Sequence, residues 1–132
     1  MTVSRRDLIL IATSPPPRAG RQALLRELIE RCLVRGDLDA ADQLLHRDYC
    51  IHAGDRTGSR RQWKQSVLAL RAQMPGLAVR VEEMWEAGDR LVWRYVMENG
   101  AQRVHGIHLE RFEDGKLIET WSCTTADWSA VI

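Results

Sequence analysis

The chain has 132 residues, of which 45% are hydrophobic, 19 are Lys or Arg and 18 are Asp or Glu. This length predicts one domain with a buried core. The net charge of +1 provides no field that would draw the protein to nucleic acid or to acidic membranes, and the sequence contains no transmembrane segment. We therefore expect neither nucleic acid nor a membrane as a partner.

The cysteines and histidines indicate neither a disulfide framework nor a metal site. Cys32, Cys50 and Cys123 are odd in number and lack CxxC spacing. The four histidines show neither HxH nor HExxH spacing with a supporting acid. We expect no cofactor and no metal, and free thiols favour a reducing, cytoplasmic location.

Residues 1–17 are predicted to form an N-terminal arm, and residues 18–132 a single domain. The arm contains Ser4-Arg5-Arg6, which resembles a twin-arginine export signal. Its apolar run, Leu8–Ala12, is shorter than the roughly 7 to 15 residues of a signal peptide and leads into prolines. We therefore expect the arm to pack against the domain or a partner rather than to direct export.

Helical periodicity predicts three helices before any long strand. The first spans Arg18–Arg35, and the second begins at the cap Asp37 and runs through Leu45. A short extended segment, Asp48–His52, follows. Ser59 then caps a third helix over Arg60–Met74, whose apolar face includes Trp63.

From Leu77 onward, alternating residues and turn signals predict a four-stranded antiparallel meander. Turns are expected at Gly88-Asp89, at Asn99-Gly100 as a two-residue loop, and at Glu113–Gly115 as a three-residue loop. The fold class is therefore α+β: three N-terminal helices pack on a strongly curved antiparallel sheet, as in a cone-like or cystatin-like roll, and enclose a pocket.

The same pairing places Glu83 and His105 opposite Arg94, with Cys123 beyond His105. We expect this face to line the pocket, because a lone acid and base among apolar residues suggests a paired, buried charge. The opposite face is expected to be the outer one and to form a homodimer through Trp93, Tyr95 and Met97. A one-residue bulge would present His108 to the pocket instead of His105, and the outward Phe112 of this register points to such a bulge.

The segments RGDLDAADQLLHRDYCIH, TGSRRQWKQSVLALRAQMPGLAVRVEEMW, EAGDRLVWRYV and LERFEDGKLIETW, in this order, resemble the SnoaL-like polyketide cyclase group of the nuclear-transport-factor-2-like superfamily. The resemblance covers roughly Leu24–Asp127. It implies a cone with a mostly apolar cavity, often dimeric through the outer sheet face. The positions that match the group's pattern are His52, Gly88, Asp89, Arg94, Arg111, Phe112, Gly115, Lys116, Glu119 and Trp121.

Two departures from the pattern bear on the reaction. Cyclases of this group carry an aspartate about four residues after the tryptophan, where this chain has Thr125. The Arg-x-Asp of related epoxide hydrolases would fall on Arg94 and Val96, so its aspartate is absent. The resemblance therefore implies the fold and a pocket without naming a reaction.

Together these observations predict a protein that binds an apolar or aromatic metabolite and acts as a cofactor-independent cyclase or isomerase, less plausibly as a hydrolase. His52 and His105 would carry protons, Arg94 would stabilise an oxyanion and Glu83 would orient Arg94. The expected ligand-binding residues are Trp63, Trp85, Val96, Ile107, Glu119, Trp121 and Cys123. The alternative is a non-catalytic ligand-binding or dimeric assembly module of the same fold.

Overall fold

The computed structural model describes residues 17–125, so the predicted packing of the N-terminal arm lies outside the described residues. The elements are α2 (Pro17–Leu28), η1 (Ile29–Val34), η2 (Leu38–Ala40), α3 (Ala41–Leu44), β1 (Leu45–Ala53), β2 (Arg56–Ser59), α4 (Arg60–Gln73), β3 (Ala78–Ala87), β4 (Arg90–Glu98), β5 (Arg103–Glu113) and β6 (Lys116–Thr124). Within this range no helix is both long and apolar enough to cross a bilayer.

The three predicted helical regions are present, with differences in their internal geometry. The first region is α-helical in α2 and π-helical in η1, and the second is a 3-10 turn followed by the single turn of α3. Asp37 makes no capping hydrogen bond and instead accepts hydrogen bonds from Arg31. Ser59 caps α4 as predicted, in a capping box with Gln62.

The end of the first helical region is tied to α4 by one arginine. Arg71 donates from Nη1 to the backbone oxygens of Leu33 at 2.7 Å and Val34 at 2.6 Å. These carbonyls have no partner within the helix because the chain turns away at Gly36, whose φ is +76°. Arg71 thereby fixes the end of η1 against α4.

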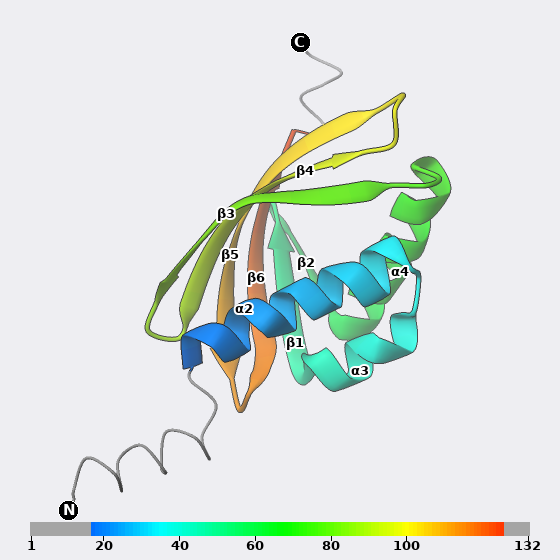
Figure 1. Cartoon of the computed structure of the whole chain (residues 1–132). Helices are drawn as coiled ribbons and strands as arrows, with labels where there is room; N and C mark the ends of the chain where they lie inside the picture. The colour runs from blue at the N-terminus through cyan, green and yellow to red at the C-terminus, as the bar shows by residue number, and fades with distance from the viewer. Residues whose placement is uncertain (1–16, 126–132) are drawn as a thin grey trace, which may run out of the picture.

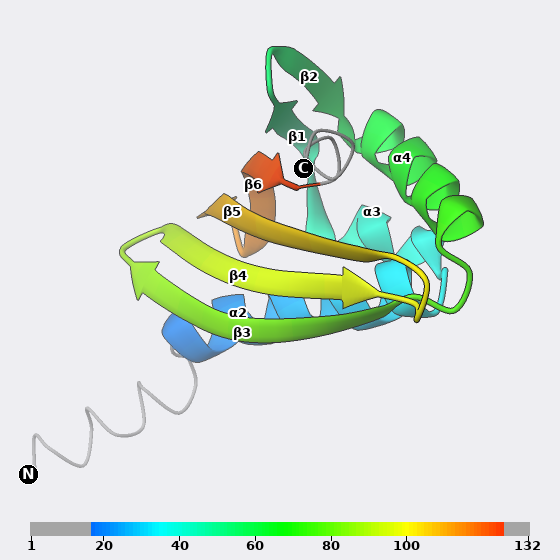
Figure 2. The ribbon, with the colours of Figure 1, turned by 90° about the horizontal axis from the view of Figure 1, so that it is seen from above.

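The sheet has six strands in the order β2-β1-β6-β5-β4-β3. The predicted meander β3–β6 is antiparallel throughout, whereas β1 pairs in parallel with β6 and extends the sheet with its own hairpin to β2. The sheet is bent, and the helices lie against one of its faces (Figures 1 and 2). The α+β class is therefore confirmed, with two more strands than the predicted meander.

A bulge in β3 changes which side chains share a face. Glu83 pairs with Arg94 as predicted, but the register shifts between Val81 and Glu83. As a result Val81 packs against the core, while Glu83 and the next alternate residue, Trp85, are exposed on the other side. Glu83 and Trp85, which were predicted to line the pocket, therefore lie on the face of β3 opposite to that of Val81.

Two later turns also differ from the prediction. The loop after β4 has four residues, because Asn99 Oδ1 accepts the amides of Ala101 and Gln102 and closes an Asx-type turn. His105 consequently lies opposite Val96 rather than Arg94.

The β5–β6 turn is the two-residue Asp114-Gly115, with Asp114 at φ 55° and Gly115 at φ 73°. A register shift between Arg111 and Phe112 then buries Phe112. The bulge suspected from the outward position of this side chain is therefore present.

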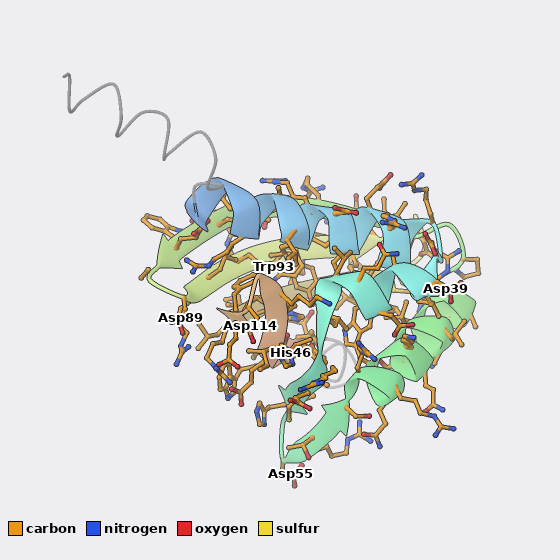
Figure 3. All side chains as sticks on the ribbon, turned by 90° about the horizontal axis from the view of Figure 1, so that it is seen from below. Asp39, His46, Asp55, Asp89, Trp93 and Asp114 are labelled. Atoms are coloured by element: carbon orange, nitrogen blue, oxygen red, sulfur yellow. The ribbon has the colours of Figure 1, made fainter. Side chains whose placement is uncertain are left out.

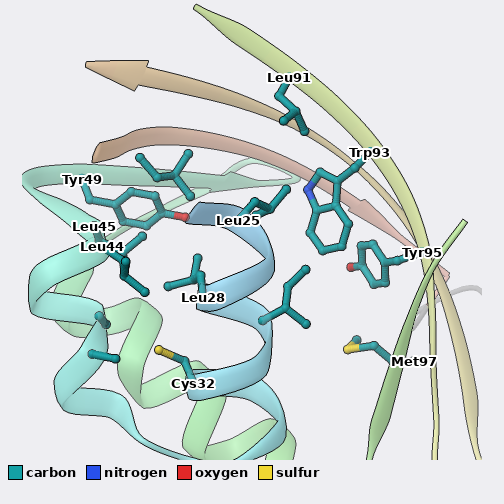
Figure 4. Packing of buried hydrophobic residues seen from close by; sticks show 14 of the residues in the cluster. Leu25, Leu28, Cys32, Leu44, Leu45, Tyr49, Leu91, Trp93, Tyr95 and Met97 are labelled. Carbon is teal, nitrogen blue, oxygen red and sulfur yellow. The ribbon is translucent and has the colours of Figure 1, made fainter. Parts of the chain in front are cut away.

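The core lies between the helices and the face of β4 that carries Trp93, Tyr95 and Met97. The prediction had placed this face on the outside. Trp93, Tyr95 and Met97 are buried and point toward Leu25 and Leu28 of α2 (Figure 4). The expectation that Trp93, Tyr95 and Met97 form an outer dimer surface was wrong, because β4 carries large apolar residues on both faces and the helices cover this one.

Candidate functional site

A cavity of about 270 Å³ lies between the inner face of the sheet and helices α2 and α4. Most of its wall is apolar, and its polar side chains come mainly from β4, β5 and β6, with Tyr49 from β1 and Ser66 from α4. The lining residues are Leu25, Leu28, Leu33, Tyr49, Ile51, Trp63, Ser66, Val67, Leu70, Val79, Trp93, Tyr95, Met97, Val104, His108, Glu110, Leu117, Thr120, Ser122 and Thr124.

Glu110 is the acid of this cavity, and its side chain is only 2% exposed. Its carboxylate accepts a hydrogen bond from Trp93 Nε1 at 2.6 Å and another from the hydroxyl of Thr120. The Tyr49 hydroxyl donates in turn to Thr120 Oγ1 at 2.7 Å. These donors compensate for the lost hydration of the carboxylate, which allows a charge to be held in an apolar wall.

His108 connects Glu110 to the open part of the cavity. Its Nδ1 lies 3.4 Å from Glu110 Oε2, and its Nε2 lies 2.9 Å from the Tyr95 hydroxyl and 3.0 Å from the Ser122 hydroxyl. Burial raises the pKa of the Tyr95 hydroxyl, so Tyr95 remains a neutral donor. A histidine oriented by a carboxylate on one nitrogen and facing hydroxyls with the other can accept or deliver a proton.

Gly106 permits the position of Tyr95. It lies directly across the β4–β5 ladder from Tyr95, and a Cβ at this position would lie 2.2 Å from Tyr95 Cζ. The tyrosine ring therefore crosses β5 where there is no side chain, and its hydroxyl reaches His108.

Most site residues predicted from the sequence lie outside this cavity. Glu83 and Arg94 do pair, at 2.8 Å, but both side chains are nearly half exposed on the outer face. Hydrogen bonds from Trp85 and then Arg94 lower the pKa of Glu83. Trp63 is the one predicted ligand-binding residue that lines the cavity. The others, Trp85, Val96, Ile107, Glu119, Trp121 and Cys123, do not, and neither do His52 and His105.

His52 belongs instead to a polar cluster on the outer face of β1, β5 and β6. Its Nε2 lies 2.7 Å from Glu119, and its ring stacks on Trp121 with a centroid distance of 5.2 Å. Arg111 donates from Nε to Glu119 at 3.0 Å, and its Nη2 lies 2.9 Å from the same carboxylate oxygen. Most of this cluster consists of residues that carried the family resemblance. Their contacts support the pairing of β1 with β6 rather than a cavity.

The hydrogen bond from His52, followed by Arg111, lowers the pKa of Glu119 below its ordinary 4.5. A lowered folded-state pKa stabilises the fold above the unfolded-state value, and this stabilisation is lost as pH falls through the folded-state value. We expect Glu119→Gln to cost about 1 kcal/mol at pH 7, since the cluster is partly exposed, and progressively less below pH 4.5. Urea unfolding from pH 7 to pH 3 measures this. Glu30→Gln, at an exposed acid of η1, is the control, and a loss from Glu119→Gln that stays constant with pH would contradict the assignment.

One group of possible metal ligands lies at the surface, formed by His46, Glu113 and Asp114. His46 and Asp114 lie near each other in Figure 3, with Nε2 of His46 3.5 Å from the Asp114 carboxylate. His46 Nδ1 accepts the amide of Asp48, so in the neutral ring Nε2 carries the hydrogen and has no free lone pair. We assign no metal to this group.

Sequence reasoning missed Glu110, Thr120, Tyr49 and Ser122, and named His108 only as the alternative to His105. An acid between Leu109 and Arg111 gives no local sign of burial. The available signal was the alternation His108, Glu110, Phe112 on one face of β5, which becomes informative once Phe112 is assigned to the core.

A model of the SnoaL-like domain family matches residues 25–120 of the chain. The chain belongs to the SnoaL-like family. The match spans α2 through most of β6 and thus includes the helices and strands that form the cavity. No curated protein sequence matches this SnoaL-like chain.

Solved structures share the fold at low sequence identity. A candidate SnoaL-like polyketide cyclase from Jannaschia sp. CCS1 has a TM-score of 0.75 and 18% identity, over 89% of this chain and 92% of that one. IdmH, a candidate polyketide cyclase from Streptomyces antibioticus, has a TM-score of 0.68 and 20% identity, over 78% and 90%. AclR, a candidate hydroxylase from Streptomyces galilaeus, has a TM-score of 0.68 and 24% identity, over 80% and 75%. These similarities establish the fold of this SnoaL-like protein. Its chemistry has to be inferred from the residues that line the cavity.

Proposed function

We propose that the protein binds an apolar or aromatic small molecule in the cavity and transfers protons on it, as cyclisation and isomerisation reactions require. The observation that carries this proposal is the His108–Glu110 pair within a mostly apolar wall. Structural neighbours that are candidate cyclases are consistent with it. A cytoplasmic location belongs to the same proposal, since Cys32, Cys50 and Cys123 are free thiols.

His108 is the proposed proton carrier, in place of His52 and His105. With the ring hydrogen on Nδ1, which lies 3.4 Å from Glu110 Oε2, the lone pair of Nε2 faces Tyr95 and Ser122 and can accept a proton from a bound molecule, directly or through a hydroxyl. The Glu110 carboxylate stabilises the imidazolium that forms, and the donors Trp93 and Thr120 hold that carboxylate in place.

Hydrogen–deuterium exchange on 2-tetralone in D2O tests the proton transfer. This two-ring ketone carries protons next to its carbonyl that a general base removes, and NMR follows their loss. The wild-type protein is expected to accelerate exchange above the buffer rate, and His108→Gln to lower the protein-dependent rate by about a hundredfold or more. His105→Gln, a matched change on the outer face, should leave the rate unaltered. Equal rates for wild type and His108→Gln would contradict the proposal.

A second candidate function, assembly through the outer sheet face, is favoured by a specific observation. Trp85, Val92 and Ile107 are 67%, 39% and 51% exposed on adjacent strands, with Trp85 opposite Val92 and Ile107 opposite Arg94. Apolar side chains gathered on one sheet face are typical of a surface that is covered by a partner. We propose a homodimer through this face, in place of the buried Trp93, Tyr95 and Met97.

Ile107→Glu is expected to shift the protein toward monomer in sedimentation velocity, because it replaces an exposed apolar side chain of this surface with a charge. Leu68→Glu on α4 is the matched control, since Leu68 is also a large exposed apolar residue, at 58%, and lies away from the sheet face. Identical sedimentation of the wild type and Ile107→Glu would count against the outer face as the interface.

A further inference from the structure

We propose that the molecule taken by the cavity is a neutral carbonyl compound with a compact apolar body, whose carbonyl oxygen accepts a hydrogen bond from Tyr95 or Ser122. The inference rests on the proposed function only in taking this cavity as the ligand site. It names the charge, the polar group and the size of the ligand, each from a separate property of the wall.

The polar group follows from a surplus of hydrogen-bond donors at His108. The Tyr95 and Ser122 hydroxyls both lie within 3.0 Å of Nε2, and each supplies one hydrogen. Nε2 has a single lone pair, so it accepts from only one of them when the ring hydrogen is on Nδ1. No other acceptor for either hydroxyl lies within hydrogen-bonding distance among residues 17–125.

Other protonation states of His108 leave the surplus in place or increase it. If Nε2 carries a hydrogen, the ring donates to one hydroxyl oxygen, and both hydroxyl hydrogens remain to be accepted. Ser66, the matching hydroxyl on α4, has no surplus because it donates to the backbone oxygen of Trp63 at 2.7 Å. A molecule that displaces water from the β5–β6 wall must therefore bring an acceptor, and a carbonyl oxygen satisfies this without bringing a donor of its own.

The charge of the ligand follows from the charged residues of the lining. Glu110 is the one acid there, and the lining contains neither lysine nor arginine. A buried carboxylate or phosphate would thus face Glu110 without a dedicated cation, which costs binding free energy. Each oxygen of Glu110 already accepts one hydrogen bond, from Trp93 or from Thr120, and His108 lies beside the carboxylate, so it does not call for a cationic ligand either.

The size of the ligand follows from the cavity volume. A cavity of about 150 Å³ holds one benzene ring. The 270 Å³ of this cavity therefore suits a body of about two fused rings. Aromatic walls at Trp63 and Trp93 fit the faces or edges of such a body.

Three probes of nearly the same shape test the inference by isothermal titration calorimetry on the full chain: 2-acetylnaphthalene, 2-ethylnaphthalene and 2-naphthoate. The ketone is expected to bind the wild type about tenfold tighter than the hydrocarbon, which lacks the acceptor. It is also expected to bind at least about tenfold tighter than the carboxylate. The Tyr95→Phe/Ser122→Ala double variant should lose the preference for ketone over hydrocarbon, while the control Ser66→Ala should keep it.

The outcomes separate this inference from the proposed function. If the wild type bound the ketone and the hydrocarbon with equal affinity, the carbonyl assignment would be overturned. If the cavity-filling Val67→Trp abolished that binding, the cavity would still be the ligand site. Tighter binding of 2-naphthoate than of the ketone would overturn the assignment of a neutral ligand. Failure of all three probes to bind would contradict both proposals. The wild-type comparison requires no variant, and the single changes Tyr95→Phe and Ser122→Ala serve if the double variant does not fold.

Discussion

Replacing Glu110 with leucine is expected to lower the free energy of unfolding by about 3 to 5 kcal/mol. The indole of Trp93 and the hydroxyl of Thr120 both donate to this carboxylate in the interior, and His108 lies beside it. Leucine has a similar volume but no acceptor, so the loss comes from donors left unsatisfied rather than from a cavity. Urea denaturation followed by tryptophan fluorescence measures the change.

Glu110→Gln should cost less, about 1 to 2 kcal/mol. The amide oxygen can still accept from Trp93, and the amide NH2 can donate to Thr120 if the Tyr49–Thr120 hydrogen bond reverses direction. The control is Glu113→Leu at the exposed end of β5, where the pair with Arg111 is worth at most about 1 kcal/mol. If Glu110→Leu lowered the free energy of unfolding no more than Glu113→Leu, the hydrogen bonds from Trp93 and Thr120 to Glu110 would not stabilise the fold.

Gly106→Ala is expected to destabilise the protein by about 1 to 3 kcal/mol and to separate Tyr95 from His108. The new Cβ would lie 2.2 Å from Tyr95 Cζ and 2.3 Å from its hydroxyl oxygen, so the ring must move. The backbone itself accepts alanine, because Gly106 is not among the residues with positive φ. Thermal unfolding measures the stability, and the His108 ring resonances in NMR report the lost contact.

A double-mutant cycle isolates this contact. In a Tyr95→Ala background the methyl group of Gly106→Ala has space, so the second substitution should cost less than about 0.5 kcal/mol. Gly20→Ala in α2 is the control, since nothing lies within 4 Å of its new Cβ, and it should stabilise the helix by about 0.5 to 1 kcal/mol. Full additivity of the Gly106 and Tyr95 changes would show that the close approach is not the cause.

Local patterns in the sequence were sufficient for the three helical regions, the four-stranded meander and the family. Ser59 with Gln62 specifies the start of α4 through its own hydrogen bonds, and the Gly88-Asp89 turn sets the pairing of Glu83 with Arg94. Both features depend on residues close in the chain or on a short turn. The chain order of these elements matched the SnoaL-like pattern before any packing was known.

The two faces of the sheet could not be distinguished in this way. Because the loop after β4 is longer than predicted, His105 pairs two residues away from its predicted partner, Arg94. A shift of two residues keeps a side chain on the same face of a strand. The predicted grouping of Arg94, His105 and Cys123 on one face was therefore correct. The choice of the inner side was wrong because β4 alternates between Leu91, Trp93, Tyr95 and Met97 on one face and Val92, Arg94 and Val96 on the other. Both faces of β4 carry enough apolar residues to be the buried one.

The sequence by itself therefore determined the helical regions, the antiparallel meander and the pairing of Glu83 with Arg94, because capping, turns and alternation act over a few residues. Only the tertiary structure decided which face the helices cover, since that depends on Leu25, Leu28 and Tyr49, which lie far from β4 in the chain. The same packing brings Glu110 and Thr120 next to Trp93 and His108. The site arises from these non-local contacts, and its acid became recognisable only once its donors were in place.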